Sequence, residues 1–140
     1  MCLWIKNKKL LVAEEDIVCY KTLSKTSAGY WTAYTATYVP EDVVNGSNLF
    51  KAEGELKLEK KDHYKKREHY KYATNGGLIH TYACKDDPFE TNKHYNFDDT
   101  IFECVIPKGT KYYVGLFDGV SKSYASECIR FVKKIWEPSF

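Results

Sequence analysis

Residues 100–115 read TIFECVIPKGTKYYVG, and this stretch decides the fold. Its first eight residues alternate with a period of two and gather phenylalanine, cysteine and isoleucine on one face, which predicts a half-buried strand at 100–107. Pro107 and Gly109 then predict a tight turn. Proline presets φ at the first central position of the turn, and glycine can adopt the backbone conformation needed where the chain leaves it. A second strand is expected at 110–115.

Beyond this hairpin, the sequence predicts a third strand of an antiparallel meander. Asp118 and Gly119 give a second turn signal. The run YASECIRFV at residues 124–132 is rich in β-branched and aromatic side chains and is expected to be one closing strand. The opening stretch is therefore interpreted first as scaffold, with a candidate binding patch along its edge.

Three further strands are predicted at residues 14–23, 30–39 and 78–83, where tyrosine, threonine and β-branched residues are frequent. Residues 24–29, SKTSAG, have the composition of a loop. Residues 55–73 allow two interpretations, a strand that leads into a solvated helix or a long hairpin arm.

Two short helical segments are expected. Pro40 is placed to begin a helical turn that ends at the turn signal Asn45–Gly46. Further along, Asp87 is the predicted N-cap of a short helix, with Pro88 at the first helical position and Glu90 three residues after the cap.

The length of 140 residues fits a single globular domain spanning 1–140. The chain is 44% hydrophobic and 29% charged, and it contains no apolar run of membrane-spanning length. Aromatic residues make up 16%, which favours strands. We therefore predict an α+β fold with an antiparallel or mixed sheet and one or two short helices.

Five cysteines, an odd number without any Cys-x-x-Cys spacing, indicate free thiols in a reducing compartment. Cys19 and Cys104 lie in apolar strand-like runs and are predicted to be buried. The first residues contain no apolar signal-peptide core. A cytoplasmic location, in the cytosol of a bacterial host, is the expectation.

The segment at residues 57–71, KLEKKDHYKKREHYK, interleaves lysine and arginine with tyrosine. Cations suit phosphates and tyrosine rings suit stacked bases, so the segment is a candidate surface for nucleotides or single strands. We predict that Lys65, Lys66, Arg67 and Tyr70 contact such a ligand. The alternative is a solvated helix face whose tyrosines pack on the sheet.

His80 is a second candidate, because it lies in the run LIHTY directly after two glycines, where a backbone could approach a ligand and the imidazole could act as base or donor. The alternative is a core histidine bound to a neighbouring hydroxyl. Lys111 and Tyr113 follow the Pro-Gly turn, and Ser126 lies on the predicted neighbouring strand. Together these residues are predicted to line a polar-aromatic patch that binds a phosphate or a base.

No motif indicates catalysis, because no serine or cysteine lies in a Gly-x-Ser-x-Gly context and no glycine-rich phosphate loop is present. His63 and His69 are six residues apart, which fits no usual helical metal pair, and His94 has no paired cysteines nearby. The prediction is therefore no metal site and no cofactor, and a binding protein is favoured over an enzyme.

Four stretches in order resemble a family of small proteins from Bacteroides-type gut bacteria and their phages. They are EDIVCYK at 15–21, GLIHTY at 77–82, CVIPKGTKYYVG at 104–115 and SYAS at 123–126. The resemblance covers most of the chain. It implies a bacterial or phage setting and implies no particular activity.

The IPKGT turn near a serine-containing strand also resembles the sheet of ADP-ribosyltransferases. That resemblance implies an enzyme that uses NAD, with His80, Tyr113 and Glu127 around the nicotinamide nucleotide. The family pattern has an arginine on the first strand and a Glu-x-Glu pair, whereas this chain has Lys21 and a lone glutamate.

Three functional hypotheses follow. The first is a non-enzymatic protein that sequesters an anionic, nucleotide-type ligand, as a phage or mobile-element accessory protein acting against host defence. The second is the transferase-like enzyme. The third is a module that binds a host protein or a second copy of itself, as a homo-oligomer, through the exposed aromatic residues Trp4, Trp31 and Trp136. No membrane partner is expected.

Overall fold

The computed structural model describes residues 3–5, 10–33, 37–52, 58–60, 72–74, 78–117 and 121–139. The helices are α1 (Glu41–Val44) and α2 (Asp86–Tyr95). The strands are β1 (Leu3–Ile5), β2 (Leu11–Val12), β3 (Ile17–Thr26), β4 (Gly29–Thr32), β5 (Tyr38–Val39), β6 (Phe50–Lys51), β7 (Leu58–Lys60), β8 (Tyr72–Thr74), β9 (Ile79–Tyr82), β10 (Thr100–Ile106), β11 (Lys111–Phe117), β12 (Ser121–Ser126) and β13 (Cys128–Trp136).

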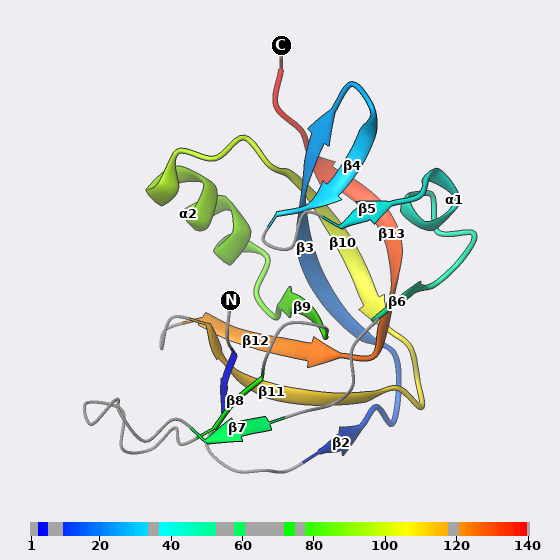
Figure 1. The fold of residues 1–140 in the computed structure, drawn as a ribbon, viewed down its shortest axis with the longest axis vertical. Helices are drawn as coiled ribbons and strands as arrows, with labels where there is room; N and C mark the ends of the chain where they lie inside the picture. Colours follow the sequence, from blue (N-terminus) through cyan, green and yellow to red (C-terminus); the bar gives the residue numbers. More distant parts are fainter. Residues whose placement is uncertain are drawn as a thin grey trace.

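The described strands hydrogen-bond in the order β6-β13-β10-β3-β9-β12-β11-β1-β8-β7, and β2, β4 and β5 pair beside this path. Every pairing between described strands is antiparallel. In Figure 1, β3, β10 and β13 follow the long axis, while β11 and β12 lie across their lower ends. Strands dominate, so the fold is richer in β structure than the predicted α+β class, and the sheet is antiparallel, not mixed.

The predicted hairpin forms the corner of this sheet. The Thr110 amide donates to the Pro107 carbonyl at 3.1 Å, and Gly109 has a φ of 87°, as the turn requires. The turn is also tied to the preceding chain, because the Lys108 amide donates to Asp16 Oδ1 at 2.9 Å. The predicted scaffold role of the Pro-Gly turn is confirmed.

The core fills the inside of the bent sheet. Cys104 of β10 pairs in register with Cys19 of β3 and with Phe131 of β13, so all three side chains share one face. All three are fully buried, and the rings of Phe131 and Phe102 meet edge to face with centroids 5.2 Å apart. The predicted burial of both cysteines is confirmed. The apolar alternation in TIFECVI is therefore the inner face of the central strand.

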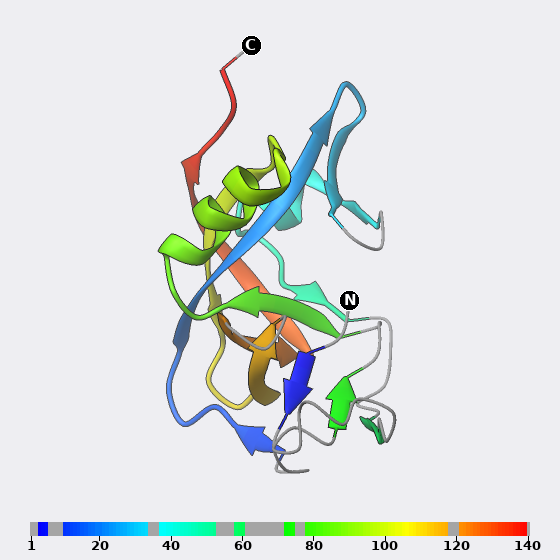
Figure 2. The same cartoon turned by 90° about the vertical axis from the view of Figure 1, so that its left-hand side faces the viewer.

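Helix α2 covers the opposite face of β3 beside β13. Its residue Phe89 packs against Trp136 with ring centroids 6.5 Å apart, and Pro88 is buried. Figure 2 shows the helix lying alongside β3. The capping prediction is wrong, because the N-cap is Lys85, without a side-chain cap hydrogen bond, and Asp87 lies inside the first turn. The helical turn after Pro40 is confirmed as α1.

Two predicted boundaries in the first half are wrong. The expected loop at residues 24–29 is mostly strand, because β3 continues to Thr26 and pairs with β4 across a two-residue turn. The single strand expected at 30–39 is two short strands, β4 and β5. Composition missed this because Ser24, Lys25 and Thr26 pair with residues 29–31 in a tight hairpin, and this pairing makes a serine- and lysine-rich segment part of β3.

The predicted closing strand is divided at Glu127 into β12 and β13. β12 pairs with β11 and β9, whereas β13 pairs with β10. The chain therefore changes neighbours at this corner, and the predicted simple meander becomes a sheet that bends around its own core. The turn signal at 118–119 lies outside the described residues, as do residues 55–57 and 61–71. The described ends of the segment, β7 and β8, pair antiparallel, as the hairpin-arm interpretation of residues 55–73 expects. Within the described part, neither helix has the length or apolar character needed to cross a lipid bilayer.

Candidate functional site

The predicted polar-aromatic patch of Lys111, Tyr113 and Ser126 is not assembled, and the separate candidate His80 lies on the same face as one of its members. Tyr113 of β11 pairs in register with Ala125 of β12, and Ala125 pairs with His80 of β9, so His80 and Tyr113 lie on one face with a small residue between them. Tyr113 is only 6% exposed. The two side chains therefore share a face, on which Tyr113 is buried and His80 is half-buried.

Ser126 and Lys111 lie apart from this pair. Ser126 is fully buried on the opposite face of β12, and its hydroxyl donates to the Cys128 carbonyl at 3.2 Å. Lys111 is exposed at the start of β11. The four residues therefore do not form one exposed patch. The other predicted contacts, Lys65, Lys66, Arg67 and Tyr70, lie outside the described residues.

His80 has the surroundings of a buried neutral histidine. Its Nδ1 lies 3.2 Å from the Leu78 carbonyl oxygen, and its own carbonyl accepts a hydrogen bond from Lys21 Nζ at 2.9 Å. Burial, with the nearby positive charge of Lys21, lowers the pKa of His80 from 6.5 to about 4. A histidine that is neutral at physiological pH fits the interpretation as a core histidine better than it fits a role in proton transfer.

The buried imidazole predicts a specific pH dependence of stability. Between about pH 6.5 and pH 4 the unfolded chain binds a proton at His80 that the folded protein does not, so stability should fall as the pH falls through this window. In His80→Gln the slope of the unfolding free energy against pH should be smaller. The difference in slope corresponds to the uptake of up to about one proton on unfolding. Urea denaturation at several pH values measures the slope. Equal slopes in the two proteins would contradict a buried neutral imidazole.

A cluster of exposed cations and one ring lies at the other end of β3. Lys25 Nζ is 5.7 Å and Lys134 Nζ 6.0 Å from the centroid of the Tyr30 ring. The ring is half-buried and is held from behind by Phe102, with centroids 5.5 Å apart and planes at 82°. We call Lys25, Tyr30 and Lys134 the cation–tyrosine cluster.

The strands explain why these residues meet. Lys25 and Tyr30 are register partners in the β3–β4 hairpin, so their side chains share a face. Lys134 pairs with Phe102 of β10, which brings it to the same side of the sheet. Glu137 accepts a hydrogen bond from Lys134 at 2.9 Å, and this contact, with the Tyr30 hydroxyl, raises the pKa of Lys134. The carboxylate of Glu137 therefore pairs with Lys134, and the positive charge of Lys25 also helps to lower its pKa.

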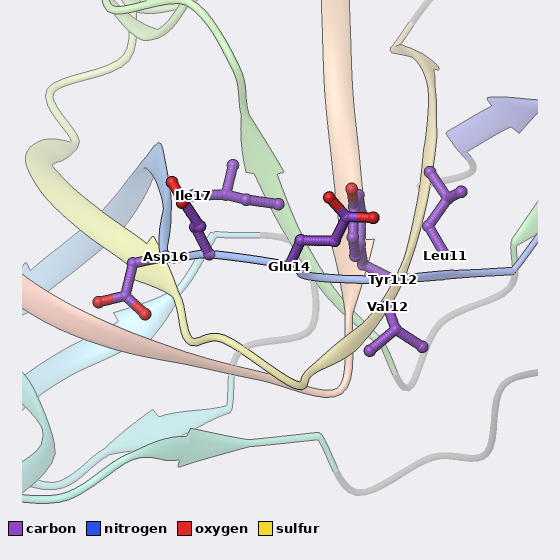
Figure 3. A pocket seen from close by; sticks show the side chains of 7 residues that line it. Leu11, Val12, Glu14, Asp16, Ile17 and Tyr112 are labelled. Atoms are coloured by element: carbon purple, nitrogen blue, oxygen red, sulfur yellow. The ribbon is translucent and has the colours of Figure 1, made fainter.

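A second surface feature is an open hollow of about 670 Å³ beside β2. Figure 3 shows Glu14 and Tyr112 pointing to the same side of the chain, with Val12 turned away. The acidic residues Glu14, Glu15 and Asp16 line it together with apolar side chains. Its negative charge does not suit an anionic ligand, so the hollow is not the predicted binding site.

The three residues of the transferase-like arrangement differ in exposure, and His80 is half-buried. Glu127 is exposed at the corner between β12 and β13, while Tyr113 is buried on β11. The Glu127 amide donates to the Lys111 carbonyl at 3.2 Å, which gives this residue a role in holding the corner. Within the described residues, no group of three or more histidine, cysteine or acidic side chains could hold a metal ion.

The candidate list from the sequence missed Lys21 and the cation–tyrosine cluster. A signal for Lys21 was present, since it shares a face with Cys19 in a run predicted to be a strand. The Lys25–Tyr30 pair depends on the register of the β3–β4 hairpin, and a loop was expected at residues 24–29, where this hairpin forms. Lys134 is far from both in sequence and is brought there by the sheet order alone.

Comparison with family models, curated proteins and solved structures finds no match to this chain.

Proposed function

We propose that this protein is a non-enzymatic binding protein for an anionic, nucleotide-type ligand, and that the ligand contacts the cation–tyrosine cluster. The observation that supports this is the convergence of Lys25 and Lys134 on the ring of Tyr30. An ammonium pairs with phosphate as a point charge, and an aromatic ring offers a surface to a base. The cluster supplies both kinds of contact in the described part of the chain.

Glu137 is the group that such a ligand must displace. The Lys134–Glu137 ion pair is solvent-exposed, with 37% and 51% of the two side chains accessible. Exposed pairs of this kind contribute only about 0–1 kcal/mol. A phosphate group offers several acceptor oxygens and can pair with both lysines, so exchange is favourable.

The setting of this function rests on the resemblance described above. In a bacterial or phage cytosol, holding a nucleotide signal would act against a host defence pathway. The cytoplasmic location and the accessory role remain predictions, and the binding experiments below address the basic segment at 57–71.

Neutralising the cluster should remove binding. Wild-type protein is screened by thermal shift against a cyclic dinucleotide, ADP-ribose and a short RNA, where a ligand at about a hundred times its dissociation constant adds about 2.7 kcal/mol of stability. For a probe that shifts, Lys25→Gln with Lys134→Gln should raise the dissociation constant at least about tenfold, because two phosphate contacts are lost. Titration calorimetry measures the constant.

Lys122→Gln is the matched control, since Lys122 Nζ lies 5.9 Å from the Tyr124 ring without a second lysine at that ring among the described contacts. It should bind as wild type does. If the cluster variant binds normally while neutralising Lys65, Lys66 and Arg67 removes binding, the site is the basic segment. If no probe shifts the protein, nucleotide binding is refuted for these ligands, and the exposed valines on the outer face, Val18 and Val132, make a protein partner the next hypothesis.

A further inference from the structure

The hollow beside β2 lies along an open strand edge. On one side β2 pairs with β11, and no other described strand pairs with it. Ala13, the next residue, donates to the Thr110 carbonyl at 2.9 Å and accepts from the Gly109 amide at 2.8 Å, so both its backbone groups face that same side. Because the peptide groups of an extended strand alternate between its two edges, the N–H and C=O of Val12 point to the open edge. Backbone groups on such an edge can pair with an added strand.

Apolar side chains border this edge. Leu10 is 39% and Val12 54% exposed, and their spacing of two residues places them on one face of the strand. Leu11 lies on the other face with its register partner Tyr112, and both are half-buried. The hollow of about 670 Å³ is lined from both faces, by Val12 as well as by Leu11 and Tyr112. Ligand pockets occupy roughly 300–1,000 Å³, so the hollow can hold the side chains of a short bound segment.

The charged groups at the edge favour a basic partner. Glu14 and Glu15 are exposed, line the hollow and form no ion pair with a described residue. Asp16 has a structural role, since its Oδ1 accepts from the Lys108 amide at 2.9 Å. A second copy that added its own β2 would bring another pair of glutamates to the same short edge, where like charges repel, whereas a basic peptide would be attracted.

The two sides of the edge differ in chemistry. Figure 3 shows the Glu14 and Tyr112 side chains pointing to one side of the chain and Val12 to the other. Lys111, the register partner of Val12, shares the Val12 side. A cation on the Glu14 side therefore meets a carboxylate and an aromatic ring, both of which stabilise ammonium and guanidinium groups. The Val12 side offers apolar contact, through Leu10 and Val12.

We propose that the β2 edge is a docking site for an extended basic peptide of a partner protein, which adds to β2 as a further strand. Successive side chains of a strand point to opposite faces, so the peptide alternates basic residues, on the side of Glu14 and Tyr112, with apolar residues on the side of Val12. The site is separate from the proposed nucleotide site. Ile17, which lines the hollow, begins β3, and Lys25 lies about 26 Å further along that strand.

A labelled peptide of about seven residues that alternates arginine with valine tests the charge requirement. Fluorescence anisotropy with the full chain should show saturable binding, and the same peptide with glutamate in place of arginine should bind at least about tenfold more weakly. Glu14→Lys with Glu15→Lys should weaken binding of the arginine peptide at least about tenfold, because two attractions become repulsions. Glu90→Lys with Asp98→Lys makes the same change of charge at exposed, distant positions and should alter binding less than about twofold.

Val12→Pro tests strand addition. Proline removes the N–H that points to the open edge and leaves the pairing with β11 in place, so the variant should melt within a few degrees of Val12→Ala. Its binding should be at least about tenfold weaker than that of Val12→Ala, which removes the side chain alone. The ligand gives the same test without changing the protein. Of two peptides, N-methylated on the valines or on the arginines, one should lose binding, since only one set of N–H groups faces β2.

Three results would overturn the proposal. The first is the absence of saturable binding, or equal binding by wild type and by Glu14→Lys with Glu15→Lys. The second is normal binding by Val12→Pro and by both methylated peptides, which would show that side chains enter the hollow without strand addition. The third is a dimer, seen by light scattering, that Val12→Pro dissociates, which would mean that a second copy occupies the edge.

Discussion

Phe131→Ala should lower the free energy of unfolding by about 4 kcal/mol, because removing a large buried ring costs its transfer free energy and leaves a cavity. Phe131 is 1% exposed. Its ring meets Phe102 at 5.2 Å and Phe50 at 6.1 Å between centroids, so the ring joins β13 to the central strand and to β6. No nearby side chain can fill the space without leaving its own contacts.

The next residue along the strand gives the matched control. Val132 is 50% exposed and lies at the bulge where β13 shifts its register against β10. Val132→Ala should change stability by less than about 1 kcal/mol, since an exposed side chain loses little contact. Urea denaturation of both variants measures the difference. Equal losses would mean that Phe131 does not hold the core together.

Gly46→Ala should destabilise the protein by about 3 to 4 kcal/mol, from a left-handed backbone that disfavours a side chain and from a steric clash. Gly46 ends helix α1 with a φ of 87°. A Cβ at this position would lie 2.6 Å from the Phe131 carbonyl oxygen. That oxygen belongs to a central strand, so it cannot move aside as a flexible side chain could.

Gly109→Ala separates the two causes. Gly109 has the same φ of 87°, but a Cβ there would meet nothing within 4 Å. This variant should lose only about 1 kcal/mol, the cost of the backbone conformation alone. Thermal and urea unfolding of the two alanine variants compare them. A loss at Gly109 as large as that at Gly46 would show that backbone conformation, not the contact with β13, determines the effect.

The hairpin around Pro107 could be predicted because its causes are local. The period-two pattern of β10 and the φ preferences of proline and glycine act within a few residues. The helix start at Asp87 was misjudged because a capping-box pattern needs the chain to approach in an extended form, whereas Lys85 is already helical. The loop expected at 24–29 became strand because β4 pairs with it.

The candidate sites depend even more than the strands on contacts that the sequence alone does not contain. His80 and Tyr113 were identified from their neighbours in sequence, and the structure places them on one face, where Tyr113 is buried and His80 is half-buried. Exposure depends on what packs above a residue, which single-sequence patterns do not contain. The cluster of Lys25, Tyr30 and Lys134 was missed because its members are held together by strand order.

By itself the sequence determined a strand-rich chain with a Pro-Gly hairpin, two buried thiols and two short helices, since these depend on local periodicity and backbone preference. Only the tertiary structure decided that one predicted strand bends at Glu127 to join two neighbours, and that Lys134 meets Tyr30. The reason is that pairing between distant strands determines which residues share a face, and burial on that face then determines their charge and chemistry.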